Sequence, residues 1–467
     1  MSRMDGDVPE NSKEKYGSVS NDLSPRRRTK TLRAMKAPYS VKRITYNPSE
    51  ANPGDRLEVR VPKLNKNEVL VPGSLALRFD IALSGGHANN FLVQNVSRAL
   101  VSQQVVKFGG AILDDIVDYD IFKIFTDLFL PEETRRSMVA EGIQSENLSN
   151  IRSEAGDKPD SGVDDEQKLE KVYSKKYRIN LDHQILTDHG VFYPQALYTD
   201  LVFELVLTPA DQVVKGSDAT KLKYKLTNIQ LEYEMIRSQD LADQATSVYE
   251  SGKEFLYDHV SRHSVKKVDT STELINIKVD SQRRSMKPIL LLFVKPYTAG
   301  ARDSEEYVFP DLKKVLVTIN GSPNMLYNNG IEGEDAWRQA SRFFIKEKHK
   351  PQHLTLNKFY ARDKFGLLVD LRAMASQEMH GSGTRLVNTT DGVQLEINRT
   401  TGKGPFNCHV FVISDAQMNI QNRQLDSVMY QNGPGKYSVQ RFDCWPDQLW
   451  QDSVSREPAP RPIQWQV

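Results

Sequence analysis

Short segments in which apolar and polar residues alternate recur along most of the chain. Residues 57–61 read Leu-Glu-Val-Arg-Val, and residues 229–235 and 393–397 alternate in the same way. This period of two predicts β-strands with one buried face. Residues 201–207 and 289–294 are short, mostly apolar runs, as expected of strands inside a sandwich. The chain is therefore predicted to be predominantly β.

Helical periodicity is limited to a few segments. They are residues 120–130, part of 131–150, residues 238–251 and residues 334–344. In each of them apolar residues recur at the spacing of one helix face. The pattern predicts helical insertions in a β protein.

The predicted strands occur in the same order in two halves of the chain. In the first half LEVRV leads to LALRFDI after Pro72, and in the second half LINIKVD leads to ILLLFV after Pro288. A strand and a glycine turn then lead into an aromatic-rich helix in each half, first VVKFGG and YDIFKIFTDLF, later VLVTING and DAWRQASRFF. The two halves open alike.

The later parts of the halves also correspond. KYRINLDHQ and LVFELVL match KFGLLVDLR and VQLEI, and IQLEYEMI and CHVFVIS close the two halves. Partners lie between roughly 180 and 215 residues apart, and the offset drifts as loops of different length would make it drift. We infer that a whole domain was duplicated, which predicts two antiparallel sandwiches joined by a short helix.

The polar segments set the predicted boundaries. We expect five parts: a flexible basic N-terminal arm (1–45), a first sandwich (46–237) with a polar insertion at about 131–172, a helical connector (238–254), a second sandwich (255–430) and a C-terminal tail (431–467). The arm is rich in polar and charged residues, which cannot offset chain entropy by burial.

Charge and cysteine content narrow the function classes. The formal net charge of +1 argues against a protein that coats nucleic acid with its whole surface. The two cysteines, Cys408 and Cys444, do not suggest a disulfide framework, which favours a reducing compartment. The sequence shows neither an apolar signal core nor a stretch of about 18 apolar residues that would span a membrane.

Several longer segments resemble a known family. KFGGAIL, LTDHGVFYPQALYTDLVFELVLTPADQVV, KYKLTNIQLEYEMIRS, TINGSPNMLYNNGIEG and MHGSGTRLVNTTDGVQLEI resemble the double jelly-roll major capsid proteins of Polinton (Maverick) elements and adintoviruses, which belong to the adenovirus hexon-like lineage. The resemblance covers about residues 55–425. It rests on the length and order of the match, since none of these segments is a short catalytic signature.

The resemblance implies a fold and an assembly. The fold would be all-β, with two tandem antiparallel eight-stranded jelly-roll sandwiches and helical insertions. The chain would be a structural subunit without enzymatic activity or cofactor, forming homotrimers of pseudo-hexagonal outline. These capsomers would contact neighbouring capsomers and minor vertex proteins and tile an icosahedral shell around double-stranded DNA. The location would be the virion, with assembly in the host nucleus or otherwise in the cytoplasm.

Two polar segments carry candidate contact residues. The arm contains the densest basic run of the chain, a candidate for DNA contact or nuclear import, with plain solvation or binding to neighbouring capsid proteins as the alternatives: Arg26, Arg27, Arg28, Lys30, Arg33 and Lys36. The tail contains three of the four tryptophans, Trp445, Trp450 and Trp465. Such side chains are candidates for anchoring in a neighbouring subunit, the alternative being that they fold back on their own sandwich.

No catalytic or metal site is predicted. Asp182, His183, Asp188 and His189 lie close together in sequence, but Asp188-His189-Gly190 also fits a turn with glycine at positive φ. No Ser-His-Asp or Cys-His set can be assembled from the sequence. The rival functions are a jelly-roll protein that binds or cleaves carbohydrate, which predicts a groove lined by aromatic rings and carboxylates, and a minor vertex protein of the capsid.

Overall fold

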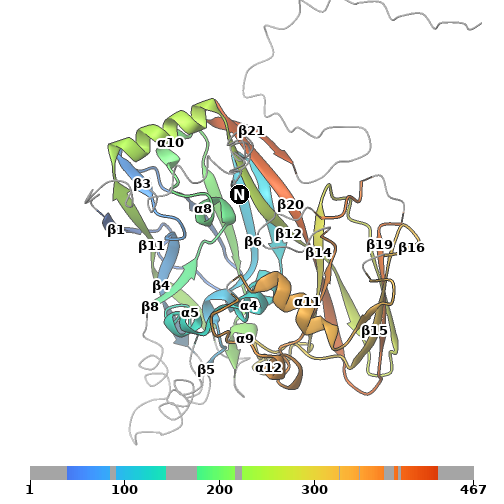
Figure 1. Ribbon diagram of the computed structural model, residues 1–467. Coiled ribbons are helices and arrows are strands. Elements are labelled where there is room, and N and C mark those ends of the chain that lie inside the picture. The colour runs from blue at the N-terminus through green and yellow to red at the C-terminus, as the bar shows by residue number, and fades with distance from the viewer. Residues whose placement is uncertain are drawn as a thin grey trace, which may run out of the picture.

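The chain forms two β-sandwiches that lie side by side (Figure 1). The computed structural model describes residues 39–84, 91–143, 176–215, 223–324, 327–346, 348–372, 383–387 and 391–429. The helix α10 (Gln239–Ser251) lies at one end of the molecule, and α12 (Leu356–Ala361) lies at the opposite end.

The first sandwich contains eight main strands in two sheets. They are β1 (Tyr39–Thr45), β2 (Arg56–Arg60), β4 (Ala76–Ser84), β6 (Val101–Phe108), β7 (Ala111–Val117), β8 (Lys176–Asn180), β9 (Leu201–Leu207) and β11 (Lys223–Arg237). One sheet has the order β1-β11-β4-β8, and the other runs β2-β9-β6-β7. Three short strands accompany them: β3 (Glu68–Leu70), β5 (Phe91–Leu92) and β10 (Val214–Lys215).

The second sandwich repeats this arrangement. Its main strands are β12 (Lys253–Val268), β13 (Leu274–Val279), β14 (Met286–Val294), β15 (Leu312–Ile319), β16 (Ser322–Pro323), β18 (Gly366–Asp370), β19 (Val393–Arg399) and β20 (Phe406–Gln421). One sheet has the order β12-β20-β14-β18 and the other β13-β19-β15-β16. The accessory strands are β17 (Ile331–Glu332) and β21 (Gln424–Met429).

The strand connections of the two halves are identical. If the eight main strands of each half are numbered in chain order, both halves contain one sheet of order 1-8-3-6 and one of order 2-7-4-5. This is the connection of an antiparallel jelly roll, so the structure is a double jelly roll. The duplication inferred from the sequence pattern is confirmed strand by strand, including each pair of segments that was matched above.

One sheet runs through both rolls. The strand β7 of the first roll and β12 of the second pair in parallel at Asp115 and Ser261. This pairing joins four strands from each roll into one path, β18-β14-β20-β12-β7-β6-β9-β2. The connector α10 spans from β11 to β12, and it begins where the Ser238 hydroxyl accepts a hydrogen bond from the Leu241 N–H.

Equivalent sheets of the two rolls differ in burial. In the first roll, β8 alternates between buried and partly or fully exposed residues, so one face of its sheet meets solvent. In the second roll, β18 is buried along its whole length, and β14 is buried at every residue except Lys287. Burial on both faces explains why Ile289–Val294 reads as a continuous apolar run, because neither face has a position for a polar side chain.

The helices lie mainly between strands and at the ends of the rolls. Three were predicted closely, namely α4 (Tyr119–Asp127), α10 and α11 (Asp335–Phe344), and α5 (Glu132–Ser137) lies in the segment where some helix was expected. The short helices α3 (Val96–Ala99), α8 (Gln184–Thr187), η2 (Pro194–Ala196), α9 (Ala210–Val213) and α12 were not predicted. Three to six residues are too few for a periodic pattern.

Two predicted boundaries need correction. Residues 39–45 were assigned to the arm, but they form β1, which pairs with β11 along its whole length. The pattern is hidden because β1 is an edge strand whose seven residues are all at least partly exposed. The connector was also drawn too long, since β12 begins at Lys253. Residues 1–38, most of the polar insertion and residues 430–467 lie outside the described residues.

The corrected boundary can be tested by truncation. A chain lacking residues 1–45 should unfold at a temperature lower by at least about 3 °C than one lacking residues 1–37. The shorter chain loses the β1 ladder and leaves the buried Glu68 carboxylate without its Lys42 partner. Thermal unfolding followed by circular dichroism measures the difference. Equal midpoints would show that β1 contributes nothing to the fold.

Candidate functional site

The contact between the two rolls is the candidate functional site. Within the described ranges, no group of three or more His, Cys, Asp and Glu side chains could hold a metal ion. None of the helices in those ranges is both long and apolar enough to cross a bilayer. The contacts between residues 46–237 and residues 253–429, called the inter-roll interface below, instead gather buried rings and buried charges from both halves.

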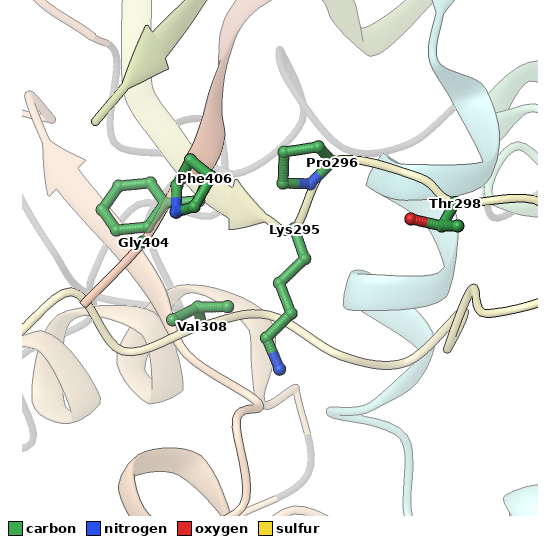
Figure 2. A pocket seen from close by; sticks show the side chains of 7 residues that line it. Lys295, Pro296, Thr298, Val308, Gly404 and Phe406 are labelled. Carbon is green, nitrogen blue, oxygen red and sulfur yellow. The ribbon is translucent and has the colours of Figure 1, made fainter. Parts of the chain in front are cut away.

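A pocket in the second roll has little chemistry to offer. It has a volume of about 340 Å³ and is lined by Lys295, Pro296, Thr298, Val308, Gly404, Pro405 and Phe406 (Figure 2). Phe406 is the single aromatic ring in this lining, which holds no carboxylate. The ammonium group of Lys295 pairs with Glu306. The lining therefore differs from the aromatic and carboxylate groove that the carbohydrate hypothesis predicts.

Aromatic rings of α4 form the apolar part of the inter-roll interface. The ring centroid of Phe122 lies 5.4 Å from that of Phe411 in β20, and the Phe125 centroid lies 5.2 Å from that of Tyr307. Phe125 also meets Phe344 of α11 at 5.8 Å. These edge-on and tilted arrangements are favourable for aromatic pairs. The helix α4 of the first roll thus covers the outer face of the second roll's sheet.

A glycine in β18 makes room for this helix. A Cβ atom on Gly366 would overlap the ring of Phe125, and Gly366 has a backbone φ that any residue can adopt. The glycine is therefore required by close packing between the rolls rather than by a turn. The signal was visible in the sequence as a glycine inside a strand pattern, which often marks a close approach of another group.

Two buried ion pairs cross the inter-roll interface. Arg302 of the second roll pairs with Asp120 of α4, and Arg135 of α5 pairs with Glu305 at 2.6 Å. All four side chains are almost completely buried. Burial raises the pKa of Asp120, although the nearby Arg302 guanidinium acts in the opposite direction. Because unpaired buried charges are costly, these pairs restrict the rolls to one relative position.

Two aspartates of the first roll bind histidines of the second. The Asp114 carboxylate lies 2.8 Å from Nδ1 of His259 in the second roll and 2.9 Å from Nε2 of His183 in the first roll. Burial opposes ionisation of Asp114, but the two histidines outweigh it and lower its pKa. Asp118 lies 2.8 Å from Nδ1 of His409 and also binds an arginine of β12. Each carboxylate therefore connects α4 or β7 to the strands of the second roll.

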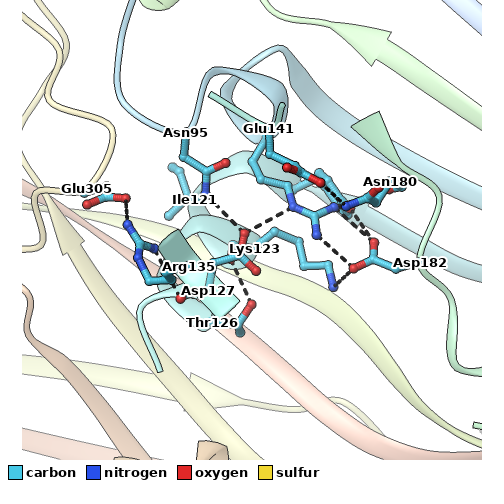
Figure 3. Close-up of polar contacts among 12 residues, drawn as sticks. Asn95, Ile121, Lys123, Thr126, Asp127, Arg135, Glu141, Asn180, Asp182 and Glu305 are labelled. Atoms are coloured by element: carbon cyan, nitrogen blue, oxygen red, sulfur yellow. Dashed lines mark hydrogen bonds and ion pairs between the residues drawn. The ribbon is translucent and has the colours of Figure 1, made fainter. Parts of the chain in front are cut away.

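A buried arginine holds α4 in place within the first roll. Arg98 binds Asp182 through two nitrogens, at 2.8 and 3.0 Å, and Asp127 at 3.2 Å. Lys123 also binds Asp182, and Figure 3 shows the two side chains turned toward each other. Burial opposes ionisation of Asp182, but Arg98 and Lys123 hold its pKa well below the usual range. The network connects α3, α4 and the end of β8.

The four clustered residues singled out in the sequence do not converge on one site. Asp182 binds Arg98, whereas His183 caps α8 by accepting a hydrogen bond from the Ile185 N–H and contacts Asp114. Asp188 accepts a hydrogen bond from Thr187, and His189 contacts the Leu256 carbonyl at 2.8 Å. The predicted turn is present, because Gly190 has a φ of +82°.

The predicted contact residues of the arm and tail lie elsewhere in the chain. None of them is among the described residues: Arg26, Arg27, Arg28, Lys30, Arg33, Lys36, Trp445, Trp450 and Trp465. The interface residues were missed at the sequence level because most of them are single charges or rings in apolar surroundings. A charged residue within an otherwise helical apolar face, such as Asp120, was the available signal.

Comparisons with known proteins support the fold. No family model matches the sequence, and no curated protein matches it significantly. Among solved structures, PBCV-1 VP54, fitted into a reconstruction of the virophage Sputnik, is 11% identical with a TM-score of 0.55 over 86% of this chain and 99% of that one.

Two further solved structures are similar. The mavirus major capsid protein is 10% identical, with a TM-score of 0.52 over 92% of this chain and 98% of that chain. The Faustovirus major capsid protein is 9% identical, with a TM-score of 0.51 over 82% and 90%. At these identities the likeness establishes the fold, the double jelly roll.

Substitution of Gly366 should weaken the packing between the two rolls. Gly366→Ala is expected to destabilise the protein by about 1–3 kcal/mol, because the new methyl group overlaps Phe125. Phe125→Leu combined with Gly366→Ala should be less destabilised than the sum of the single variants. Denaturant unfolding of the four proteins measures this coupling. Additive effects would show that Phe125 does not cause the cost.

A histidine near the inter-roll interface should make stability depend on pH. Burial, together with the charges of Arg135 and Lys358, lowers the pKa of His353 to about 4. The unfolded chain therefore binds a proton that the folded chain does not, so this contribution to stability falls as the pH drops from about 6.5 towards 4.

The variant His353→Gln isolates this contribution. It should lose less stability than the unmodified chain between pH 7.5 and pH 5 in denaturant unfolding. Parallel losses in the two proteins would mean that His353 is equally protonated in both states and would contradict the assignment.

Proposed function

We propose that this chain is a viral major capsid protein that assembles as a trimer and has no catalytic activity. The double jelly roll is the fold of the similar capsid proteins, which supports a structural role. The main support for the trimer is a difference between the two rolls of the chain. Two equivalent sheets have the same strand order, but within the part of the chain that the structure describes only the sheet of the second roll has its outer face covered.

The two rolls provide a template for contact between chains. Inside the chain, the edge strand β7 of the first roll pairs with the edge strand β12 of the second. The strand of the second roll that is equivalent to β7 is β16, and the strand of the first roll that is equivalent to β12 is β1. Both lie at sheet edges. Placing β16 of one chain beside β1 of the next repeats the internal contact. Three chains then close a ring of six similar rolls, which is a flat tile of six-fold outline.

The exposed sheet of the first roll has the features of a contact surface. Tyr39 and Val41 point to one side of β1 and are 55% and 48% exposed. Beside them, Glu232 of β11 pairs with Arg43 at 2.6 Å and Arg78 at 3.2 Å. Apolar side chains bordered by arginines are common in interfaces between subunits. The proposal places this surface against the second roll of the next chain.

The finer parts of the proposal rest on the sequence. We assign the chain to the Polinton or adintovirus group of capsid proteins, on the segments quoted above. The capsomers would tile an icosahedral shell around double-stranded DNA together with minor vertex proteins, after assembly in the host nucleus. The basic run of the arm would contact DNA or serve nuclear import, and the tryptophans of the tail would anchor in neighbouring subunits.

Light scattering after size exclusion tests the trimer. The chain has a mass of 53.1 kDa, so a capsomer should elute as a species of about 160 kDa. Val41→Arg should abolish this species and leave a folded monomer, since the new side chain faces Glu234 on the neighbouring strand and is accommodated in the single chain.

Leu256→Arg provides the matched control. Leu256 is 56% exposed on β12, away from the proposed contact, so this variant should remain a trimer. A persistent monomer of the unmodified chain would favour the carbohydrate-binding alternative. A trimer that tolerates Val41→Arg would refute the proposed contact surface.

A further inference from the structure

A buried carboxylate at the inter-roll interface has histidines as its charged partners. Asp114 of β7 is 4% exposed, and its oxygens bind His183 at 2.9 Å and His259 at 2.8 Å. The Val260 N–H also donates to it, at 3.2 Å. Among the residues that the structure describes, no lysine or arginine forms an ion pair with this carboxylate. Within this part of the chain, the opposite charge has to come from an imidazole.

The hydrogen bonds of His183 show that it is not the charged ring. Its Nδ1 accepts a hydrogen bond from the Ile185 N–H at 3.3 Å, so this nitrogen has no proton. Its Nε2 therefore carries the single ring proton and donates it to Asp114. A second proton on His183 would break the bond that caps α8. His183 is thus neutral in the folded chain.

The ring of His259 has a different set of contacts. Its Nδ1 lies 2.8 Å from an oxygen of Asp114 and 2.9 Å from the Leu113 carbonyl oxygen. Both of these neighbours are acceptors, so Nδ1 carries a proton. A second proton on Nε2 would make the ring an imidazolium and leave both contacts of Nδ1 in place. His259 is therefore the ring that can neutralise the carboxylate.

Burial makes this second proton favourable. Burial alone would raise the pKa of Asp114, but the hydrogen bonds from His183 and His259 lower it, so the group is an anion. A buried anion is costly unless a cation lies beside it. Proton binding by His259 turns the contact into an ion pair that crosses from β7 to β12.

A second contact of the same kind does not need the extra proton. His409 of β20 contacts Asp118 at 2.8 Å, and the Arg262 guanidinium binds the same carboxylate at 2.7 Å. An arginine side chain keeps its positive charge throughout the pH range in which proteins are folded. The contact of Asp118 with His409 is therefore a natural control for that of Asp114 with His259, since it differs by a permanent cation.

The other ionisable groups on the elements around His259 have contacts of their own. Each of them has a partner other than His259. They are Asp115 of β7, Asp182, Asp188 and His189 of the segment around α8, Lys253, Tyr257 and Asp258 of β12, Lys287 of β14 and Asp415 of β20. Asp114 is the carboxylate that contacts His259 directly.

We propose that His259 carries a second proton in the folded chain and that its ion pair with Asp114 is a pH-sensitive joint between the two rolls. In the unfolded chain an imidazole releases this proton above about pH 6.5. The folded chain then binds a proton that the unfolded chain does not, so this contribution to stability is present below that pH and is lost as the pH rises. The joint belongs to the single chain and does not depend on the proposed capsid function.

Denaturant unfolding of the full chain at pH 6.5 and pH 8.5 tests the joint. His259→Gln keeps a donor for Asp114 but binds no proton. Between these pH values, the folding equilibrium constant of the unmodified chain should fall at least about fivefold more than that of His259→Gln. The matched control His409→Gln should fall like the unmodified chain. The buried Cys408 thiol, whose pKa burial raises, also responds to pH, but it contributes equally to all variants.

Asp114→Asn tests the same joint from the first roll. It removes the carboxylate that favours the proton, so its equilibrium constant should fall like that of His259→Gln and not like that of the unmodified chain. Equal falls in the unmodified chain and in whichever of these two variants folds would overturn the proposal. A pH dependence that His409→Gln removes and His259→Gln retains would overturn it as well.

Nuclear magnetic resonance of the unmodified chain, labelled at histidine, gives a readout that a merely structural role would not change. At pH 6.5 both ring nitrogens of His259 should be protonated, whereas His183 should have one protonated nitrogen. A neutral His259 ring at this pH would contradict the proposal. Light scattering on the same samples reports the assembly state, so a monomer with the expected pH response would remove the capsid function and leave the joint.

Discussion

The structure depends on covering a sheet that is apolar on both faces. One face of the β12-β20-β14-β18 sheet is covered by the other sheet of its own roll, and α4 of the first roll lies on the outer face. Because exposed apolar area of this size is unfavourable in water, the second roll is expected to need the first. The parallel pairing of β7 with β12 and the contact of Phe125 with Gly366 follow from the same requirement.

The buried charges of the interface fix the position of one roll relative to the other. Apolar packing tolerates small shifts, whereas the contacts of Arg135 with Glu305 and of Asp114 with His259 are favourable in one arrangement only. Arg98 extends the same constraint into the first roll by holding α4 against the end of β8. The two rolls therefore form a unit of defined geometry, which is what a repeated tile requires.

Much of the fold could be predicted from the sequence because the duplication repeats each local pattern. A strand such as 201–207 is ambiguous alone, but it has a counterpart at 393–397 in the same place of the order. The edge strand β1 was not predicted, since none of its seven residues is fully buried and its apolar residues Tyr39, Val41 and Ile44 are exposed. The interface charges could not be paired either, because Arg135 and Glu305 are 170 residues apart and only the docking of the rolls brings them together.

The two outer sheets differ in polarity, and the order of folding and assembly explains this difference. If both outer sheets were as apolar as β14 and β18, the isolated chain would expose one of them before assembly and would aggregate. The first roll instead carries Arg43, Arg78 and Glu232 on the exposed sheet, which are compatible with water. The contact within the chain can thus be permanent and apolar, while the proposed contact between chains is polar enough to form after each chain has folded.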